Sequence, residues 1–285
     1  MAQDSHATER KTTDTSVLMK VGILGVGTIA EALTIGLCAF GDRRAKVVLS
    51  PRNEKTSLRL ALRFPEVTVA ADNQAVVNGS DIVVLAVRPQ VVEEVLSALH
   101  FRPEQQILSL IATFSTGQLA SLVAPATAIS RAVPLPPVAE RQGPMALFTD
   151  SVEILSLLDG LGRIVRMENE ADLDLTSAVT SLMGTYFGML GAVDQWLIDR
   201  GFSPEASRAF VSELFFNLAS AARKRPEDTF TRLSTDYSTP GGLNEHAWRE
   251  LRAAGWPDQI EDSLDLILNR IHGRATLETR LSQAG

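Results

Sequence analysis

Two glycines and an alanine, spaced Gly25-x-Gly27-x-x-Ala30, stand directly after an apolar run at residues 21–24. Gly25 would permit a tight turn, and Gly27, which lacks a side chain, would let a pyrophosphate approach the backbone. Ala30 would let a following helix pack closely on the strand, and the N-terminus of that helix favours negative charge. The spacing predicts a dinucleotide site; an ordinary strand–turn–helix built from small residues is the plain alternative.

The end of the next expected strand, at residues 46–49, bears on which dinucleotide would bind. An acidic residue there would bond the ribose 2′-hydroxyl and favour NAD, but the strand ends without one. Ser50, Arg52 and Asn53 offer a hydroxyl, a guanidinium and an amide, which suit a 2′-phosphate. We therefore predict NADP(H), while the alternative role of Arg52 is that of a solvated turn residue.

These loops need a scaffold that brings strand ends together. Strand and helix patterns alternate from Val21 to about Arg166, which predicts a doubly wound parallel sheet in a Rossmann-type α/β domain. The unbroken apolar run at residues 82–87 is typical of a parallel strand buried on both faces. Further strands are expected at 67–69, 106–112 and 128–133, and helices at 54–64, 74–77, 91–99 and from 116. Ligands of such sheets bind beyond the carboxyl ends of the strands, here residues 25–28, 50–53, 86–89, 112–114 and 134–137.

The character of the chain changes at about residue 170, after which only helices are expected. Residues 173–198 form one long apolar pattern that carries Gly184, Gly188 and Gly191, and small residues permit close approach of another helix. A second helix is expected at 205–222. Pro240-Gly241-Gly242 would open a later helix and expose backbone N–H groups. The predicted organisation is a disordered tail at 1–18, a dinucleotide-binding domain at 19–168, and an all-α domain at 169–285.

Composition excludes several other classes. The 285 residues carry a formal net charge of −7, which argues against a dedicated nucleic-acid binder. No apolar run is long enough for a membrane span, and the polar N-terminus does not resemble a signal peptide. The single cysteine, Cys38, rules out a disulfide within the chain and suits the cytoplasm. The four histidines lack ligand spacing, so no metal site is expected.

Several segments of the chain, taken together, resemble the pyrroline-5-carboxylate reductase family, from Lys20 to about Ile271. They are residues 25–30 (its fingerprint), 50–53 (its NADP-selecting turn), 72–73 (its Asp-Asn), 86–90 (its Ala-Val-Lys-Pro-Gln, with Arg88 for Lys), 131–134 (its Arg-Val-Met-Pro) and 238–242 (its Ser-Pro-Gly-Gly). From these matches and the strand ends we predict a set of cofactor-binding residues: Gly25, Val26, Gly27, Thr28, Ile29, Ser50, Arg52, Asn53, Asn73, Ala86, Val87, Arg88, Pro89 and Ala112.

The resemblance also implies an activity and an assembly. Members of this family reduce a cyclic imine carboxylate to proline with NAD(P)H. They form dimers, or larger rings of dimers, through interlocking helical domains, so that the substrate site forms at the subunit contact. The apolar, glycine-bearing pattern at residues 173–198 is consistent with such a dimerisation domain.

The chain departs from the family at the substrate end. Leu243 and Asn244 stand where the family has a small residue and a substrate-bonding Thr, residues 135–137 replace its Asn-Thr-Pro, and residues 182–187 keep little of its Gly-Ser-Gly-Pro-Ala. We expect Asn244 to bond the imine or its carboxylate and Thr239 to orient the substrate. The other predicted substrate residues are Gly241, Gly242, Leu243 and Tyr186.

These departures leave several readings open. A retained reaction on a related imine and ordinary divergence within true pyrroline-5-carboxylate reductases both fit. A reductase of the hydroxyacid-dehydrogenase class usually has a Lys in the central helix, and residues 173–198 contain none. A non-catalytic NADPH-binding protein is the third possibility. His246 would be an acid for a ketone substrate, or a helix-surface histidine. The basic run at 223–225 would hold a substrate carboxylate, or simply end a helix.

Overall fold

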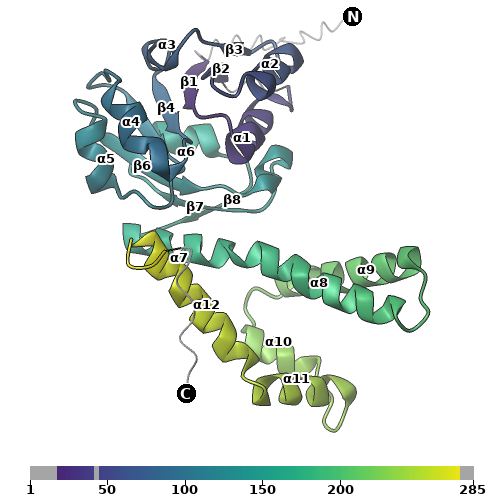
Figure 1. Ribbon diagram of the computed structural model, residues 1–285. Helices are drawn as coiled ribbons and strands as arrows, with labels where there is room; N and C mark the ends of the chain where they lie inside the picture. Colours follow the sequence, from purple (N-terminus) through teal and green to yellow (C-terminus); the bar gives the residue numbers. More distant parts are fainter. Residues whose placement is uncertain (1–17, 42–44, 277–285) are drawn as a thin grey trace, which may run out of the picture. The chain divides into compact units, whose positions relative to one another are not determined.

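The computed structural model describes residues 18–41 and 45–276 (Figure 1), so the predicted disordered tail at 1–18 lies almost wholly outside the described residues. The chain divides into two compact units, Met1–Leu173 and Asp174–Gly285. The first is an α/β unit and the second is helical.

The first unit is built on one eight-stranded sheet in the order β3-β2-β1-β4-β5-β6-β7-β8. Strands β1 to β6 run parallel, and β1 pairs with β2 on one side and β4 on the other. The order therefore reverses beside β1, which is where such sheets bind nucleotides. The strands are β1 (Met19–Leu24), β2 (Ala45–Leu49), β3 (Val67–Val69), β4 (Ile82–Leu85), β5 (Gln106–Ser109), β6 (Ala128–Val133), β7 (Pro144–Phe148) and β8 (Arg163–Arg166).

Helices cover both faces of this sheet. On one face Ile23 and Val84 pack with residues of α1 (Thr28–Cys38), α2 (Glu54–Arg63), the 3-10 turn η2 (Pro136–Glu140) and α6 (Val152–Leu158). On the other face Leu24 and Leu85 pack with α3 (Asn73–Asn78), α4 (Val92–Ser97) and α5 (Thr116–Leu122); the 3-10 turn η1 (Pro89–Val91) leads into α4. Alternate residues of β4 are buried in the two opposite cores, which explains why its sequence is apolar throughout.

The far edge of the sheet differs from the prediction. Strand β7 runs antiparallel to β6, whereas a wholly parallel sheet was expected, and β8 then pairs parallel to β7. A parallel connection needs roughly a dozen or more residues, usually with a helix. The link from β6 to β7 holds only the short η2, and Arg141 at its end adopts a left-handed φ of 56°. The chain therefore turns back on itself instead of crossing over.

The second unit consists of helices over its described residues: most of α7 (Glu170–Thr180), then α8 (Leu182–Ile198), α9 (Pro204–Lys224), α10 (Phe230–Asp236), α11 (Leu243–Ala253) and α12 (Trp256–Ile271). The single helix expected at 173–198 is interrupted at Ser181. The hydroxyls of Thr180 and Ser181 each donate to a carbonyl three residues earlier, at 2.7 Å, which competes with the helical bonding pattern.

Few side chains of the second unit are buried. Among its described residues, Ala178 and Val211 are the buried hydrophobic ones. Large apolar side chains are exposed instead, including Phe187 at 66%, Phe216 at 67% and Trp196 at 54%. None of the described helices is long and apolar enough to span a bilayer. The second unit therefore exposes an extensive apolar surface.

Candidate functional site

The two glycines of the fingerprint have different tasks in the structure. Gly25 follows β1 with φ at +90°, and a Cβ there would lie 2.7 Å from the carbonyl oxygen of Ala86. Gly27, the N-cap residue of α1, has φ at −87°, and a Cβ there would meet nothing within 4 Å. No side chain caps the start of α1. Gly25 is thus required by packing, while Gly27 leaves open space before uncapped N–H groups, as a pyrophosphate needs.

Of the three residues expected to bind the 2′-phosphate, two instead form hydrogen bonds to the backbone of the fingerprint turn. The N–H of Gly25 donates to Ser50 Oγ at 3.0 Å, and Ser50 is buried. Asn53 Nδ2 donates to the Val26 carbonyl at 2.7 Å. Arg52 is exposed, and its side chain makes no hydrogen bond to any described residue. Of the three side chains, Arg52 is the one free to meet a phosphate.

The remaining cofactor candidates line the same edge of the sheet. Ala86 continues β4, with its N–H bonded to the Leu24 carbonyl at 2.9 Å, and Arg88 behind it is exposed. Asn73 is the first residue of α3, whose start is capped by the Asp72 carboxylate. Val26, Thr28 and Ile29 belong to the fingerprint turn, and Val87, Pro89 and Ala112 follow β4 and β5. The first unit thus brings every predicted cofactor residue to the carboxyl ends of its strands.

A buried guanidinium supports this edge. Arg131 of β6 is 2% exposed; its Nη2 donates to the Ala112 carbonyl at 2.8 Å and its Nη1 to Glu170 Oε1 at 2.7 Å. The backbone N–H and the hydroxyl of Thr116 also donate to Glu170, at 2.7 and 2.9 Å. Burial raises the pKa of the Glu170 carboxyl, but the hydrogen bonds from Thr116 and Arg131 together hold its pKa below the usual value. Glu170 therefore stays ionised, and Arg131 fixes the loop that carries Ala112.

The substrate candidates around Pro240 form a closed turn at the start of α11. The N–H of Gly242 donates to the Thr239 carbonyl at 2.8 Å, and the N–H of Gly241 donates to Glu245 Oε2 at 2.5 Å. Asn244 Nδ2 donates to the Tyr237 carbonyl at 2.8 Å. Leu243 is 88% exposed. Two backbone donors that we expected to be open thus have partners within the chain.

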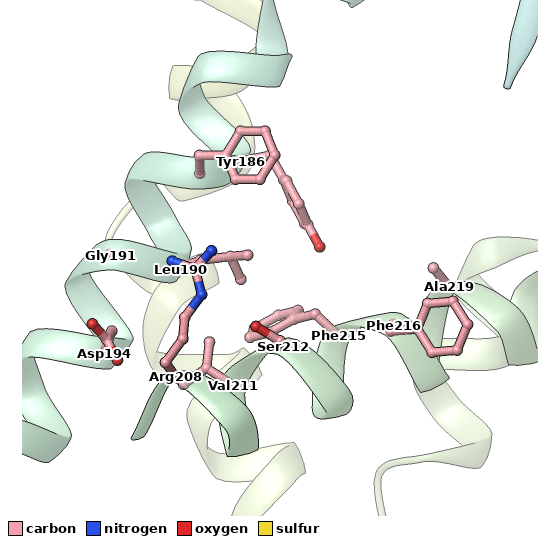
Figure 2. Close-up of a pocket in the computed structure, with 11 residues that line it drawn as sticks. Tyr186, Leu190, Gly191, Asp194, Arg208, Val211, Ser212, Phe215, Phe216 and Ala219 are labelled. Atoms are coloured by element: carbon pink, nitrogen blue, oxygen red, sulfur yellow. The ribbon is translucent and has the colours of Figure 1, made fainter. Parts of the chain in front are cut away.

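Tyr186 belongs to a separate feature, an apolar groove between α8 and α9 (Figure 2). Its ring meets Phe215 of α9 edge-on, with 6.4 Å between centroids. The groove has a volume of about 380 Å³ and is lined by side chains that include Phe187, Leu190, Arg208 and Phe216. The aromatic contacts of Tyr186 are with Phe187 and Phe215, both of which line this groove.

The other polar candidates of the helical unit are engaged or exposed. Arg225 bonds the carboxylates of Asp228 and Asp236, while His246 is 62% exposed and lies 3.6 Å from Glu250. Within the described parts of the chain, no group of three His, Cys, Asp or Glu residues is placed to hold a metal ion. His246 is a helix-surface residue in this arrangement.

Known proteins resemble this chain in sequence and in fold. Residues 20–113 match a protein family described as NADP oxidoreductase, coenzyme F420-dependent. A pyrroline-5-carboxylate reductase of Haemophilus influenzae is 25% identical over 90% of this chain and 98% of its own length. The solved 1-pyrroline-5-carboxylate reductase of Streptococcus pyogenes has a TM-score of 0.79 at 23% identity, over 90% of this chain and 99% of that one. The Plasmodium falciparum pyrroline carboxylate reductase, solved with NADP bound, has a TM-score of 0.77 at 17% identity, over 90% of this chain and 98% of that one.

Fold and sequence similarity thus extend over nine-tenths of the chain. Over most of its length the chain is similar to pyrroline-5-carboxylate reductases. The predicted plan, a Rossmann-type α/β domain followed by a helical one, is confirmed by the likeness to the solved reductases. The departures from the reductase motifs at 135–137, 182–187 and 243–244 fall in the segment of η2, in α8 and at the start of α11.

Two features of the structure are not indicated by the predicted site residues. Arg131 was noticed as part of a motif, but nothing indicated that Glu170, 39 residues later, is its partner. Glu245 was not considered, although an acidic residue at the third position of a helix commonly reaches back to N–H groups at the helix start. The position of Glu245 relative to Gly242 was therefore a usable signal.

Proposed function

We propose that this protein uses NADPH to reduce the C=N bond of a small cyclic imine or imino acid, as its relatives' names suggest for pyrroline-5-carboxylate. The observation that carries the cofactor assignment is the open, uncapped start of α1 above Gly27, with Arg52 exposed at the acid-free end of β2. The guanidinium of Arg52, near a helix N-terminus that can bind a pyrophosphate, suits a 2′-phosphate. Kept motifs along the nucleotide edge support the same conclusion.

Reduction of a protonated imine asks the chain mainly to orient two reactants in a dry pocket. The nicotinamide supplies the hydride when it is bound. Asn244 has given its amide N–H to Tyr237, so its Oδ1 is left as an acceptor, which is what an iminium N–H requires. The Thr239 hydroxyl is the neighbouring group that we assign to orienting the ring. No buried acid is needed, because the imine arrives protonated.

The test is NADPH oxidation by the purified protein with pyrroline-5-carboxylate and with a panel of other cyclic imines. Turnover of any of these supports the proposal, and the ranking identifies the substrate. If NADPH binds and no imine is reduced, the proposed activity is wrong and a non-catalytic NADPH-binding role replaces it. If the protein reduced 3-oxo acids and no imine, the hydroxyacid-dehydrogenase alternative would be favoured instead. The absence of Lys from residues 173–198 counts against that alternative.

We also propose that a second copy of the chain covers the α8–α9 face. Phe187, Phe210 and Phe216 are each more than half exposed on these two helices, and a stable interface buries roughly 800 Å² on each partner. The Phe216→Asp substitution should convert dimers to monomers in light scattering after gel filtration. Leu62→Asp is the matched control, because Leu62 is 89% exposed on α2 of the other unit. Monomeric wild-type protein would contradict this assembly. We place the protein in the cytoplasm, since a chain with a single cysteine suits a reducing compartment.

A further inference from the structure

Two groups in the helical unit are suited to receive a carboxylate. One is the backbone N–H of Gly241, in the turn that opens α11, and the other is the guanidinium of Arg225, after α9. A substrate such as pyrroline-5-carboxylate carries a carboxylate beside its imine. Whether these two groups are available therefore bears on which imines the proposed reaction accepts.

Both groups are already bonded to carboxylates of this chain. Glu245 Oε2 accepts from the Gly241 N–H at 2.5 Å. Arg225 Nε donates to Asp228 Oδ2 at 2.6 Å, and Arg225 Nη2 donates to Asp236. Asp236 is also paired with Arg232, at 2.9 Å. The hydrogen bonds of Asp236 and Asp228 raise the pKa of Arg225, and the bond from Arg225 holds the pKa of Asp236 below its usual value. These pairs are therefore ionised at neutral pH.

The charge balance of this region is unfavourable to another anion. Arg225 and Arg232 are paired with Asp228 and Asp236, and Glu245 has no cationic partner among the described contacts. One of the two N–H groups of the Asn244 amide donates to the Tyr237 carbonyl, so at most one remains for a carboxylate. Leu243, 88% exposed, presents hydrocarbon at the same turn.

We propose that Glu245 is a specificity-determining residue that makes the protein prefer cyclic imines without a carboxylate. The inference rests on the proposed imine reduction. A substrate carboxylate would have to displace Glu245 from Gly241 and remain beside it. Two like charges about 4 Å apart repel by about 1 kcal/mol even in bulk water, which is roughly a fivefold loss of affinity. A protonated imine without a carboxylate is instead a cation, which the Glu245 carboxylate attracts.

The same contact also closes the start of α11, as glutamates near helix N-termini often do. If Glu245 only capped α11, replacing it would change the stability of the helix and not the choice between substrates. The test therefore needs a variant that keeps an acceptor oxygen and removes the charge. Glu245→Gln does this, and Glu250→Gln is the matched control, because Glu250 lies on the same helix and contacts His246 and Arg249.

The experiment measures kcat/KM of the full-length protein with NADPH for 1-pyrroline and for pyrroline-5-carboxylate. We expect the wild type to prefer 1-pyrroline. Glu245→Gln should shift the ratio at least about fivefold toward pyrroline-5-carboxylate, mainly through KM, and Glu250→Gln should leave it unchanged. A wild type that prefers pyrroline-5-carboxylate, or a Glu245→Gln ratio equal to that of the control, would overturn the inference.

A binding measurement separates this inference from the proposed reaction. Saturation-transfer NMR in the presence of NADPH compares pyrrolidine with proline, which NADPH cannot reduce. One outcome is that no imine is reduced, that pyrrolidine binds to the wild type, and that proline binds only to the Glu245→Gln variant. The proposed reaction is then wrong, and the proposed role of Glu245 in selectivity is supported. If neither ring binds any variant, both are wrong.

Discussion

Gly25 and Gly27 lie two residues apart, and the structure predicts opposite consequences when each is replaced by alanine. At Gly25 a side chain requires φ near +90°, which costs an L-residue about 1–2 kcal/mol. Its Cβ would also lie 2.7 Å from the Ala86 carbonyl oxygen, and moving packed backbone costs about 1–3 kcal/mol more. Gly25→Ala should thus destabilise the first unit by about 2–5 kcal/mol, which lowers Tm by roughly 4–20 °C for a unit of this size.

Gly27→Ala should instead leave the fold intact and weaken NADPH. Its φ of −87° suits any residue, its Cβ would have free space, and exchanging Gly for Ala at an N-cap costs only a few tenths of a kcal/mol. The methyl would keep a pyrophosphate from the N–H groups of α1. Loss of one charge-assisted hydrogen bond, about 1.5–3 kcal/mol, corresponds to a roughly 10- to 150-fold rise in Kd.

The assay can follow each unit by its own signal. All three tryptophans, Trp196, Trp248 and Trp256, lie in the second unit, so their fluorescence does not report the first. Far-UV circular dichroism and calorimetry report both units, so a transition that they show and tryptophan fluorescence does not belongs to the first unit. NADPH fluorescence reports binding. The reasoning is refuted if Gly25→Ala melts like the wild type, or if Gly27→Ala binds NADPH with unchanged Kd.

Further outcomes follow from the nucleotide edge. Arg52→Ala should raise the Kd of NADPH roughly 30- to 100-fold and hardly change that of NADH, because the guanidinium would meet only the 2′-phosphate; equal losses in parallel titrations would refute this role. Arg131→Met should destabilise the first unit by about 3–5 kcal/mol in urea unfolding at pH 7, because it removes the cationic partner of the Glu170 carboxylate. A loss of stability below about 1 kcal/mol would argue against this network. The pKa of Glu170 is lowered by folding, so its stabilising contribution is complete above the unfolded value of about 4.3 and is lost as pH falls through the folded value. Glu170→Gln should therefore flatten the dependence of stability on pH below about 4.3, and an unchanged acid profile would contradict the assignment.

The nucleotide edge was largely predictable because its requirements are local. A turn that only glycine can make, a strand end without an acid, and apolar runs buried on both faces are each written in a few neighbouring residues. The antiparallel β7 was missed, because the length of the link before it matters more than its own sequence. The break at Ser181 was missed too, since two hydroxyls override an otherwise helical apolar pattern.

The substrate end was less accessible to sequence reasoning, because it depends on which donors already have partners. Free backbone N–H groups follow from Pro240-Gly241-Gly242, but their capture by Glu245 depends on the conformation of one side chain. The inward bonds of Ser50 and Asn53 are of the same kind. Residue type gives the chemistry that a side chain offers, and only the fold shows where that chemistry is used.

The scarcity of buried side chains after residue 174 has a thermodynamic consequence. A helical unit whose apolar residues are mainly exposed gains little free energy by folding alone, so in the proposed dimer most of its stability would come from association. Its melting is then governed by mass action, and its Tm should rise with the logarithm of protein concentration, while the melting of the first unit stays constant. Dilution alone would thus lower the Tm of the second unit below that of the first. Tryptophan fluorescence would report the protein concentration at which this change of order occurs.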